Sequence, residues 1–143
     1  MQIIHQSKQE DTDYIRQKVI EYNISKLPEK LVKPVEKVSF ILKDQNETIL
    51  GGITGTIKYN HLHVDFLWVD ESQRGTGFGS NLLHKIEELA KKKKCRLIVL
   101  DSFSFQAPEF YKKHGYNEFA VLNDYPEGFS QHFFEKRLED ESL

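Results

Sequence analysis

Cysteine is nearly absent from this sequence of 143 residues, and long apolar runs are missing altogether. The single Cys95 excludes an intrachain disulfide and a zinc cluster built from cysteines. No apolar stretch approaches the roughly 20 residues that span a bilayer, so a membrane helix is excluded as well. Residues 1–6 lack the basic and apolar parts of a signal peptide. We therefore expect a cytoplasmic protein without a membrane partner.

A large charge of one sign is also missing, because 20 Lys and Arg stand against 22 Asp and Glu, for a net charge of −2. This balance argues against nucleic acid as the main partner, since such proteins carry a strongly basic surface. The composition, 38% hydrophobic and 29% charged, is that of a globular protein. Because the chain is short and contains no internal repeat or long linker, we expect one domain over residues 1–143.

The apolar spacing of the first half predicts a strand, a helix and then three strands. Ile3 and Ile4 fit a short strand, and residues 11–13 offer N-cap side chains for the helix. Period-two alternation predicts strands over about 35–42, 48–59 and 61–69. In the third strand, one face is expected to carry Leu62, Val64, Phe66 and Trp68. The other face is expected to carry His61, His63, Asp65, Leu67 and Val69.

The second half predicts two helices and three further strands. Apolar residues from Leu82 to Ala90 form one stripe of an amphipathic helix. A buried strand is expected at 96–100, and a short helix at 107–113 ends in His114-Gly115. Two final strands, over about 116–122 and 131–137, flank a turn-rich loop at 123–130. Cys95, beside a buried strand, is expected to be a small core residue.

The most informative segment is the turn Arg74-Gly75-Thr76-Gly77-Phe78-Gly79, between the third strand and the amphipathic helix. Its alternating glycines let the backbone curl and leave amide N–H groups free to face an anion. The helix that follows adds unpaired N–H groups and a positive dipole end at the same place. These features suit a diphosphate, although a turn without any ligand has the same pattern.

Two common phosphate-binding motifs do not match this turn. A Walker loop ends in Gly-Lys-Ser/Thr, whereas Gly79 is followed by Ser80 and Asn81. A Rossmann motif has different glycine spacing and lies in a parallel βαβ unit, whereas this turn follows three strands of a meander. A phosphate-binding protein of another kind remains an alternative.

Two segments carry a family resemblance. Residues 69–79 resemble the acetyl-CoA-binding motif of GCN5-related N-acetyltransferases (GNAT), (Gln/Arg)-x-x-Gly-x-(Gly/Ala), with Arg74, Gly77 and Gly79 in the defining positions. Residues 107–116 resemble the Ala-x-x-Phe-Tyr-x-x-x-Gly-Phe segment of the same family. The resemblance implies an α/β (α+β) fold of the GNAT type: a mixed, mostly antiparallel central sheet with helices on both faces.

The resemblance also implies acetyl-CoA as co-substrate and no metal. Backbone groups of Leu67, Trp68 and Val69 would hold the pantetheine arm, and one of their amides would polarise the thioester carbonyl. The diphosphate would lie on the backbone of Arg74, Gly75, Thr76, Gly77, Phe78 and Gly79. Ser104 stands where an asparagine often contacts the coenzyme, and Gln106 is a candidate substitute.

The implied reaction is N-acetylation by direct attack of a primary amine on the thioester. Tyr111 matches the family tyrosine that protonates the leaving sulfur as a general acid. His63 is the candidate general base, directly or through water, with Asp65 orienting it or attracting a cationic substrate. Glu71, Asp101 and a water chain are the alternatives for the base.

The resemblance implies that the acceptor is a primary amine of a small molecule or peptide. Residues 27–37 and 123–130 are expected to face it, and Asp124, Tyr125 and Glu127 at its entrance would favour a cation. The family resemblance also allows a homodimer. The competing interpretation is a CoA-binding or regulatory module without catalysis, against which the presence of Tyr111 argues.

Overall fold

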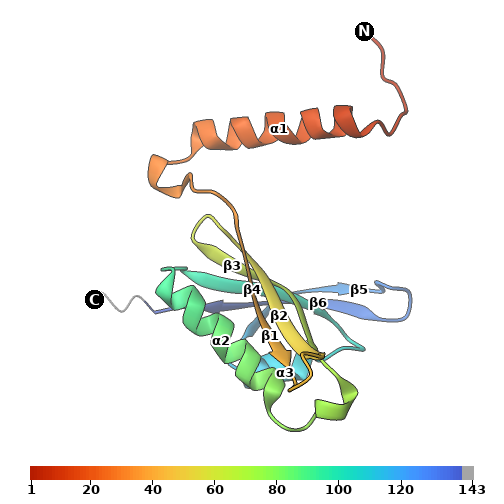
Figure 1. The fold of residues 1–143 in the computed structure, drawn as a ribbon. Helices are drawn as coiled ribbons and strands as arrows, with labels where there is room; N and C mark the ends of the chain where they lie inside the picture. Colours follow the sequence, from red (N-terminus) through yellow and green to blue (C-terminus); the bar gives the residue numbers. More distant parts are fainter. Residues whose placement is uncertain (140–143) are drawn as a thin grey trace. The chain divides into compact units, whose positions relative to one another are not determined.

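The computed structural model describes residues 1–139, and its chain divides into two compact units. The first unit is Met1–Lys33, and the second begins at Pro34 (Figure 1). Each unit is described below by itself.

The first unit contains one long helix, α1 (Gln9–Lys26), and one turn of 3-10 helix, η1 (Glu29–Leu31). The helix begins before the expected cap residues: Lys8 is the N-cap and makes no side-chain hydrogen bond, while Glu10 and Asp11 lie in the first turn. Acidic side chains there interact favourably with the helix dipole. None of the side chains of α1 is buried. Among the described residues, no helix is both long and apolar enough to cross a membrane.

The strand expected at Ile3 and Ile4 is wrong, because residues 1–8 form neither helix nor strand. Both isoleucines are exposed. A strand is stabilised by the hydrogen bonds of a neighbouring strand, and no strand pairs with this segment in the described structure. Two adjacent apolar residues are therefore insufficient to specify one.

The second unit is built on a six-stranded sheet in the order β1-β2-β3-β4-β6-β5. Its strands are β1 (Glu36–Lys43), β2 (Ile49–Lys58), β3 (His61–Val69), β4 (Leu97–Phe103), β5 (Asn117–Asn123) and β6 (Ser130–Arg137). Every neighbouring pair is antiparallel except β3 and β4. The predicted mixed, mostly antiparallel sheet is thus confirmed.

A β-bulge at Asp65 changes which side chains of β3 face the core. Thr54 of β2 lies opposite Phe66 and the next residue, Gly55, lies opposite Val64, so Asp65 has no residue opposite it. The extra residue reverses the alternation. Leu62 and Val64 before the bulge, and Leu67 and Val69 after it, pack on the core.

The expected single face with Phe66 and Trp68 beside Leu62 and Val64 is therefore wrong. Phe66 is 77% exposed and Trp68 is 47% exposed. A regular alternation in the sequence does not reveal where a bulge interrupts it.

The parallel contact between β3 and β4 is short. The two strands pair only at three positions, from His61 opposite Leu97 to His63 opposite Val99. Each strand continues well beyond this point, since β3 runs to Val69 and β4 to Phe103. The sheet therefore opens at its centre, next to the bulge.

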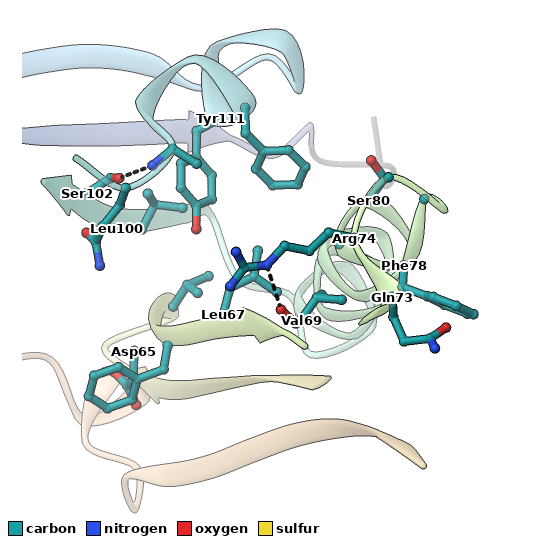
Figure 2. A pocket seen from close by; sticks show the side chains of 18 of the residues that line it. Asp65, Leu67, Val69, Gln73, Arg74, Phe78, Ser80, Leu100, Ser102 and Tyr111 are labelled. Carbon is teal, nitrogen blue, oxygen red and sulfur yellow. Dashed lines mark hydrogen bonds between the residues drawn. The ribbon is translucent and has the colours of Figure 1, made fainter. Parts of the chain in front are cut away.

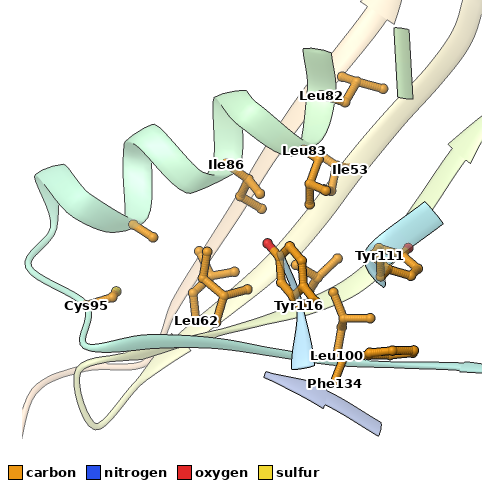
Figure 3. Packing of buried hydrophobic residues seen from close by; sticks show 13 residues of the cluster. Ile53, Leu62, Leu82, Leu83, Ile86, Cys95, Leu100, Tyr111, Tyr116 and Phe134 are labelled. Atoms are coloured by element: carbon orange, nitrogen blue, oxygen red, sulfur yellow. The ribbon is translucent and has the colours of Figure 1, made fainter. Parts of the chain in front are cut away.

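One continuous core lies between the sheet and the helices α2 (Phe78–Lys92) and α3 (Pro108–Lys113) (Figure 3). Its buried members are Ile53, Leu62, Val64, Leu82, Leu83, Ile86, Ala90, Cys95, Ile98, Leu100, Tyr111, Tyr116 and Phe134. The predicted apolar stripe of α2 supplies four of these residues, and Cys95 is a core residue as expected.

A buried carboxylate fixes α2 to the rest of the unit. Glu87 is 7% exposed, and its Oε2 accepts hydrogen bonds from the Tyr116 hydroxyl and from Lys136 Nζ, both at 2.9 Å. Lys136 Nζ also donates to the carbonyl of His114 at 2.9 Å. Burial, followed by the nearby Glu87 charge, raises the pKa of Tyr116. One carboxylate therefore joins α2, the segment after α3, and β6.

Replacement of Glu87 is predicted to destabilise the protein strongly. Glu87→Ala leaves the Tyr116 hydroxyl and the Lys136 ammonium without their shared partner, at a cost of about 3 kcal/mol in the free energy of unfolding. Urea denaturation of this variant and of Glu88→Ala, an exposed neighbour on the same helix, measures the difference. Equal stabilities of the two variants would contradict a structural role for the buried carboxylate.

Candidate active site

The glycine turn lies between β3 and α2 and includes a short 3-10 helix, η2 (Glu71–Gln73). Gly75 and Gly77 have φ values of +79° and +89°, a conformation that side chains with a Cβ rarely adopt. No atom lies within 4 Å of a Cβ built at either position. The backbone conformation, rather than crowding, therefore requires glycine at these two positions.

The turn leads directly into the N-terminus of α2. Gly77 is the N-cap, and the first hydrogen bond of the helix runs from Asn81 N to Gly77 O at 3.0 Å. The N–H groups of Phe78, Gly79 and Ser80 therefore have no acceptor within the helix. They point out of its positive dipole end, as an anion-binding site requires.

Arg74 is held across this turn. Its Nε donates to the carbonyl of Val69 at 3.0 Å (Figure 2). The bond uses one of the five N–H donors of the guanidinium group and leaves the terminal nitrogens for an anion. The Thr76 hydroxyl donates to the carbonyl of Gln73, which closes the turn on its other side.

A cavity of about 610 Å³ occupies the opening between β3 and β4. It extends to the glycine turn on one side and to α3 on another (Figure 2). Most of the predicted coenzyme-binding residues line it: Leu67, Val69, Arg74, Gly75, Gly77, Phe78, Gly79 and Gln106. Trp68 and Thr76 were also predicted, but they do not line this cavity.

The Tyr111 side chain reaches this cavity from α3, and Figure 2 shows its hydroxyl pointing toward the gap beside Leu67. The residue is 8% exposed. Burial, with a smaller effect of the Asp101 charge, raises the pKa of Tyr111 to about 12. The phenol is therefore protonated at neutral pH and able to donate a proton into the cavity.

Three titratable side chains meet where β3 and β4 begin to diverge. His63 Nδ1 lies 2.8 Å from Asp65 Oδ1, and His63 Nε2 lies 3.9 Å from Asp101 Oδ1. Asp65 and Asp101 line the cavity, whereas His63 lies behind them, outside the lining. The predicted proximity of His63 and Asp65 is present, and Asp101 lies near enough to Tyr111 for its charge to raise the pKa of that phenol.

Hydrogen bonds fix the charge state of Asp65. Burial alone raises its pKa, but the hydrogen bonds from Thr56 (2.7 Å) and His63, together with the His63 charge, outweigh burial and lower the pKa. The carboxylate is thus ionised at neutral pH and accepts hydrogen bonds only. In neutral His63, Nδ1 therefore carries the proton, and the lone pair of Nε2 faces Asp101.

Reasoning from the sequence missed several residues of the cavity lining, among them Ser80 and Phe110. Ser80 lies in the first turn of α2, with its Oγ 2.9 Å from His114 Nε2. Phe110 contributes a ring beside Gly79, where a built Cβ would lie 3.7 Å from that ring. Each of these two residues is next in the sequence to a predicted one. That adjacency is the signal by which they could have been found.

The remaining candidates have different surroundings. Gln106 lines the cavity, and its Oε1 accepts the N–H of Phe103 at 2.7 Å, which leaves the amide NH₂ available. Glu71, an alternative base, is exposed and outside the lining. Within residues 1–139, no group of three or more His, Cys, Asp or Glu side chains is arranged to hold a metal ion.

Comparison with known proteins identifies relatives of this chain. The sequence model of the acetyltransferase (GNAT) family matches residues 4–116. The chain is 36% identical to blasticidin-S acetyltransferase of Streptomyces morookaense over 107 residues, which are 74% of this chain and 79% of that protein.

Solved structures agree with this result. A crystal structure of an acetyltransferase from Bacillus cereus has a TM-score of 0.92 at 58% identity, covering 96% of this chain and 98% of that one. A Bacillus anthracis protein solved with acetyl coenzyme A has a TM-score of 0.64 at 19% identity, covering 76% of this chain and 65% of that one. At that identity, the second structure shows a shared fold alone.

Two glycine variants are predicted to differ because only one of the two positions requires a left-handed backbone. Gly77→Ala places a Cβ at positive φ and is expected to cost about 1 kcal/mol in the free energy of unfolding. Gly79→Ala meets only ordinary contacts with Phe110 and Val69, and the family motif admits alanine at this position, so stability and coenzyme binding are expected to be retained.

Thermal denaturation and calorimetric titration with coenzyme A measure the two effects. Gly77→Ala is expected to lower the melting temperature and to bind coenzyme A at least tenfold more weakly, because the altered turn no longer presents its N–H groups to the diphosphate, whereas Gly79→Ala is the control that retains both. Unchanged affinity in Gly77→Ala would show that the conformation of this turn does not determine coenzyme binding.

Proposed function

This chain belongs to the acetyltransferase (GNAT) family and is an N-acetyltransferase, and we propose that it acetylates a small cationic amine at the cavity between β3 and β4. One observation carries the proposal. The unpaired N–H groups at the start of α2 border the same cavity as the separated parts of β3 and β4.

The residues around the cavity fit acetyl-CoA. The diphosphate suits the N–H groups of Phe78, Gly79 and Ser80 together with the free nitrogens of Arg74. The pantetheine arm suits the edge of β3 beyond His63, where β4 no longer pairs and backbone groups are available. These backbone groups include those of Leu67 and Val69, which line the cavity. Bound acetyl-CoA supplies the activated acetyl group as a thioester.

The acidic side chains at the divergence point support a cationic acceptor. An alkyl amine has a pKa of about 10.4 and arrives as an ammonium ion, which Asp101 attracts. His63 Nε2 lies 3.9 Å from Asp101 Oδ1, and we propose that it takes the ammonium proton through a water molecule, because His63 lies outside the cavity lining. Asp65 holds the opposite ring nitrogen in its N–H form.

The remaining steps use Tyr111 and the backbone of β3. The freed amine attacks the carbonyl carbon, and a backbone N–H of β3 stabilises the negative charge that develops on the carbonyl oxygen. The C–N bond forms, the C–S bond breaks, and the Tyr111 hydroxyl gives its proton to the sulfur. The new amide nitrogen loses its second proton to solvent, and one proton is released overall.

The assembly and location are also proposed. The named relative acts on blasticidin S, which supports a small-molecule acceptor. We propose a homodimer, which the resemblance to the family allows. We propose a cytoplasmic location, with which the buried side chain of the single cysteine, Cys95, is compatible.

Tyr111→Phe is predicted to lose turnover while keeping coenzyme affinity. The variant retains the buried ring but lacks the proton donor, so kcat is expected to fall about 100-fold. The raised pKa keeps the wild-type phenol protonated through pH 10, so Tyr111 causes no loss of rate up to that pH. Release of free CoA thiol and calorimetry measure the two quantities. Unchanged kcat would remove the proposed acid.

His63→Gln is predicted to change the pH profile of the reaction. The variant keeps a hydrogen-bonding side chain beside Asp65 but cannot take a proton, so kcat/KM is expected to fall about 30-fold at neutral pH. The rate recovers as pH rises, because more of the acceptor is already neutral. His61→Gln, on the same strand, is the matched control. Parallel pH profiles for both variants would contradict a base at position 63.

A further inference from the structure

Four aromatic rings gather at the end of β4 and in the loop between β5 and β6. We call Phe103, Phe105, Tyr125 and Phe129 the aromatic wall. The Phe103 and Phe105 rings stack with centroids 5.3 Å apart and an interplanar angle of 5°. Tyr125 lies 5.9 Å from Phe103, and Phe129 meets Phe105 edge-on at 5.2 Å.

The aromatic wall is open on one side. Phe105, Tyr125 and Phe129 are 57%, 51% and 49% exposed, so three large rings present about half of their surface to solvent. Exposed apolar clusters of this kind mark binding sites more often than scattered surface residues do.

The aromatic wall lies next to the cavity along β4: its four residues do not line the cavity, but Asp101 and Ser102, which directly precede Phe103, do. Phe103 follows Asp101 by two positions on β4, so both side chains lie on the same face of the sheet. Gln106, which lines the cavity, accepts the N–H of Phe103 at 2.7 Å. Two positions along a strand span about 7 Å, so the aromatic wall begins about 7 Å from Asp101. A short linker spans this distance.

Hydrogen bonds hold the wall in place. Ser104 and Ser130 form two bonds, Ser104 N to Ser130 O at 2.8 Å and Ser130 N to Ser104 Oγ at 3.1 Å. Asp124 Oδ1 accepts the N–H of Gly128 at 2.8 Å, and Tyr125 N donates to Phe129 O at 3.1 Å. The backbone that carries the rings is therefore held in place before a ligand arrives, which lowers the entropic cost of binding.

We propose that the aromatic wall binds the acceptor, and that the acceptor is a primary amine joined through a short linker to a flat aromatic ring. This inference rests on the proposed N-acetyltransferase function at the adjoining cavity. The ring stacks on the exposed faces of Phe105 and Tyr125, while the ammonium group lies at Asp101. Stacking on an aromatic side chain is more favourable for a flat aromatic ring than for a saturated ring of similar size.

The test compares two amines of matched size, 2-phenylethylamine and 2-cyclohexylethylamine. The wild-type enzyme is expected to prefer the phenyl compound about fivefold in kcat/KM, chiefly through KM. Phe105→Ala and Tyr125→Ala each reduce this preference to less than twofold, by raising KM for the phenyl compound. Phe119→Ala is the control, because Phe119 is also exposed but contacts Phe133 outside the wall.

The outcomes separate this inference from the proposed function. Acetylation of both amines with equal kcat/KM overturns the aromatic acceptor and leaves the N-acetyltransferase function standing. Loss of a dimer in the wall variants, measured by sedimentation, with unchanged preference between the amines assigns the wall to a protein interface and also overturns it. Absence of transfer to any primary amine contradicts both proposals.

Discussion

The divergence of β3 and β4 is the constraint on which the site depends. Two parallel strands that stayed paired would satisfy each other's backbone groups and leave no space between them. Here the pairing stops at His63 and Val99, beside the bulge at Asp65. The bulge and the divergence together produce a cavity of about 610 Å³ at the centre of the sheet. The same bulge turns Leu67 and Val69 toward the core side and places a carboxylate at the mouth of the opening.

Groups of opposite charge lie on different sides of that opening. The start of α2 and Arg74 form its positive side, suited to a diphosphate. Asp65 and Asp101 form its negative side, suited to an ammonium ion, with His63 behind them. Tyr111 stands between the two as a protonated phenol. The buried Glu87 network keeps α2, and with it the positive side, in position relative to β6.

Most of the sheet, and the turn itself, were predictable from the sequence. The alternation before β3, the glycine spacing at 75–79 and the segment at 107–116 identified the elements and most of the cavity lining. The bulge was not located, because Leu62 through Trp68 alternate regularly and only the pairing with β2 reveals the extra residue. Ile3 and Ile4 were assigned to a strand from local pattern, although strand formation depends on a partner. Asp101 was ranked low as a base because its distance from His63 is a property of the fold and not of the sequence.

A crystal structure of this protein with coenzyme A tests the central claim most directly. The account predicts that the pantetheine arm lies between β3 and β4, with diphosphate oxygens within hydrogen-bonding distance of the N–H groups of Phe78, Gly79 and Ser80. The sulfur is then expected next to the Tyr111 hydroxyl. Coenzyme A bound at another surface, with β3 and β4 closed on each other, would contradict the account.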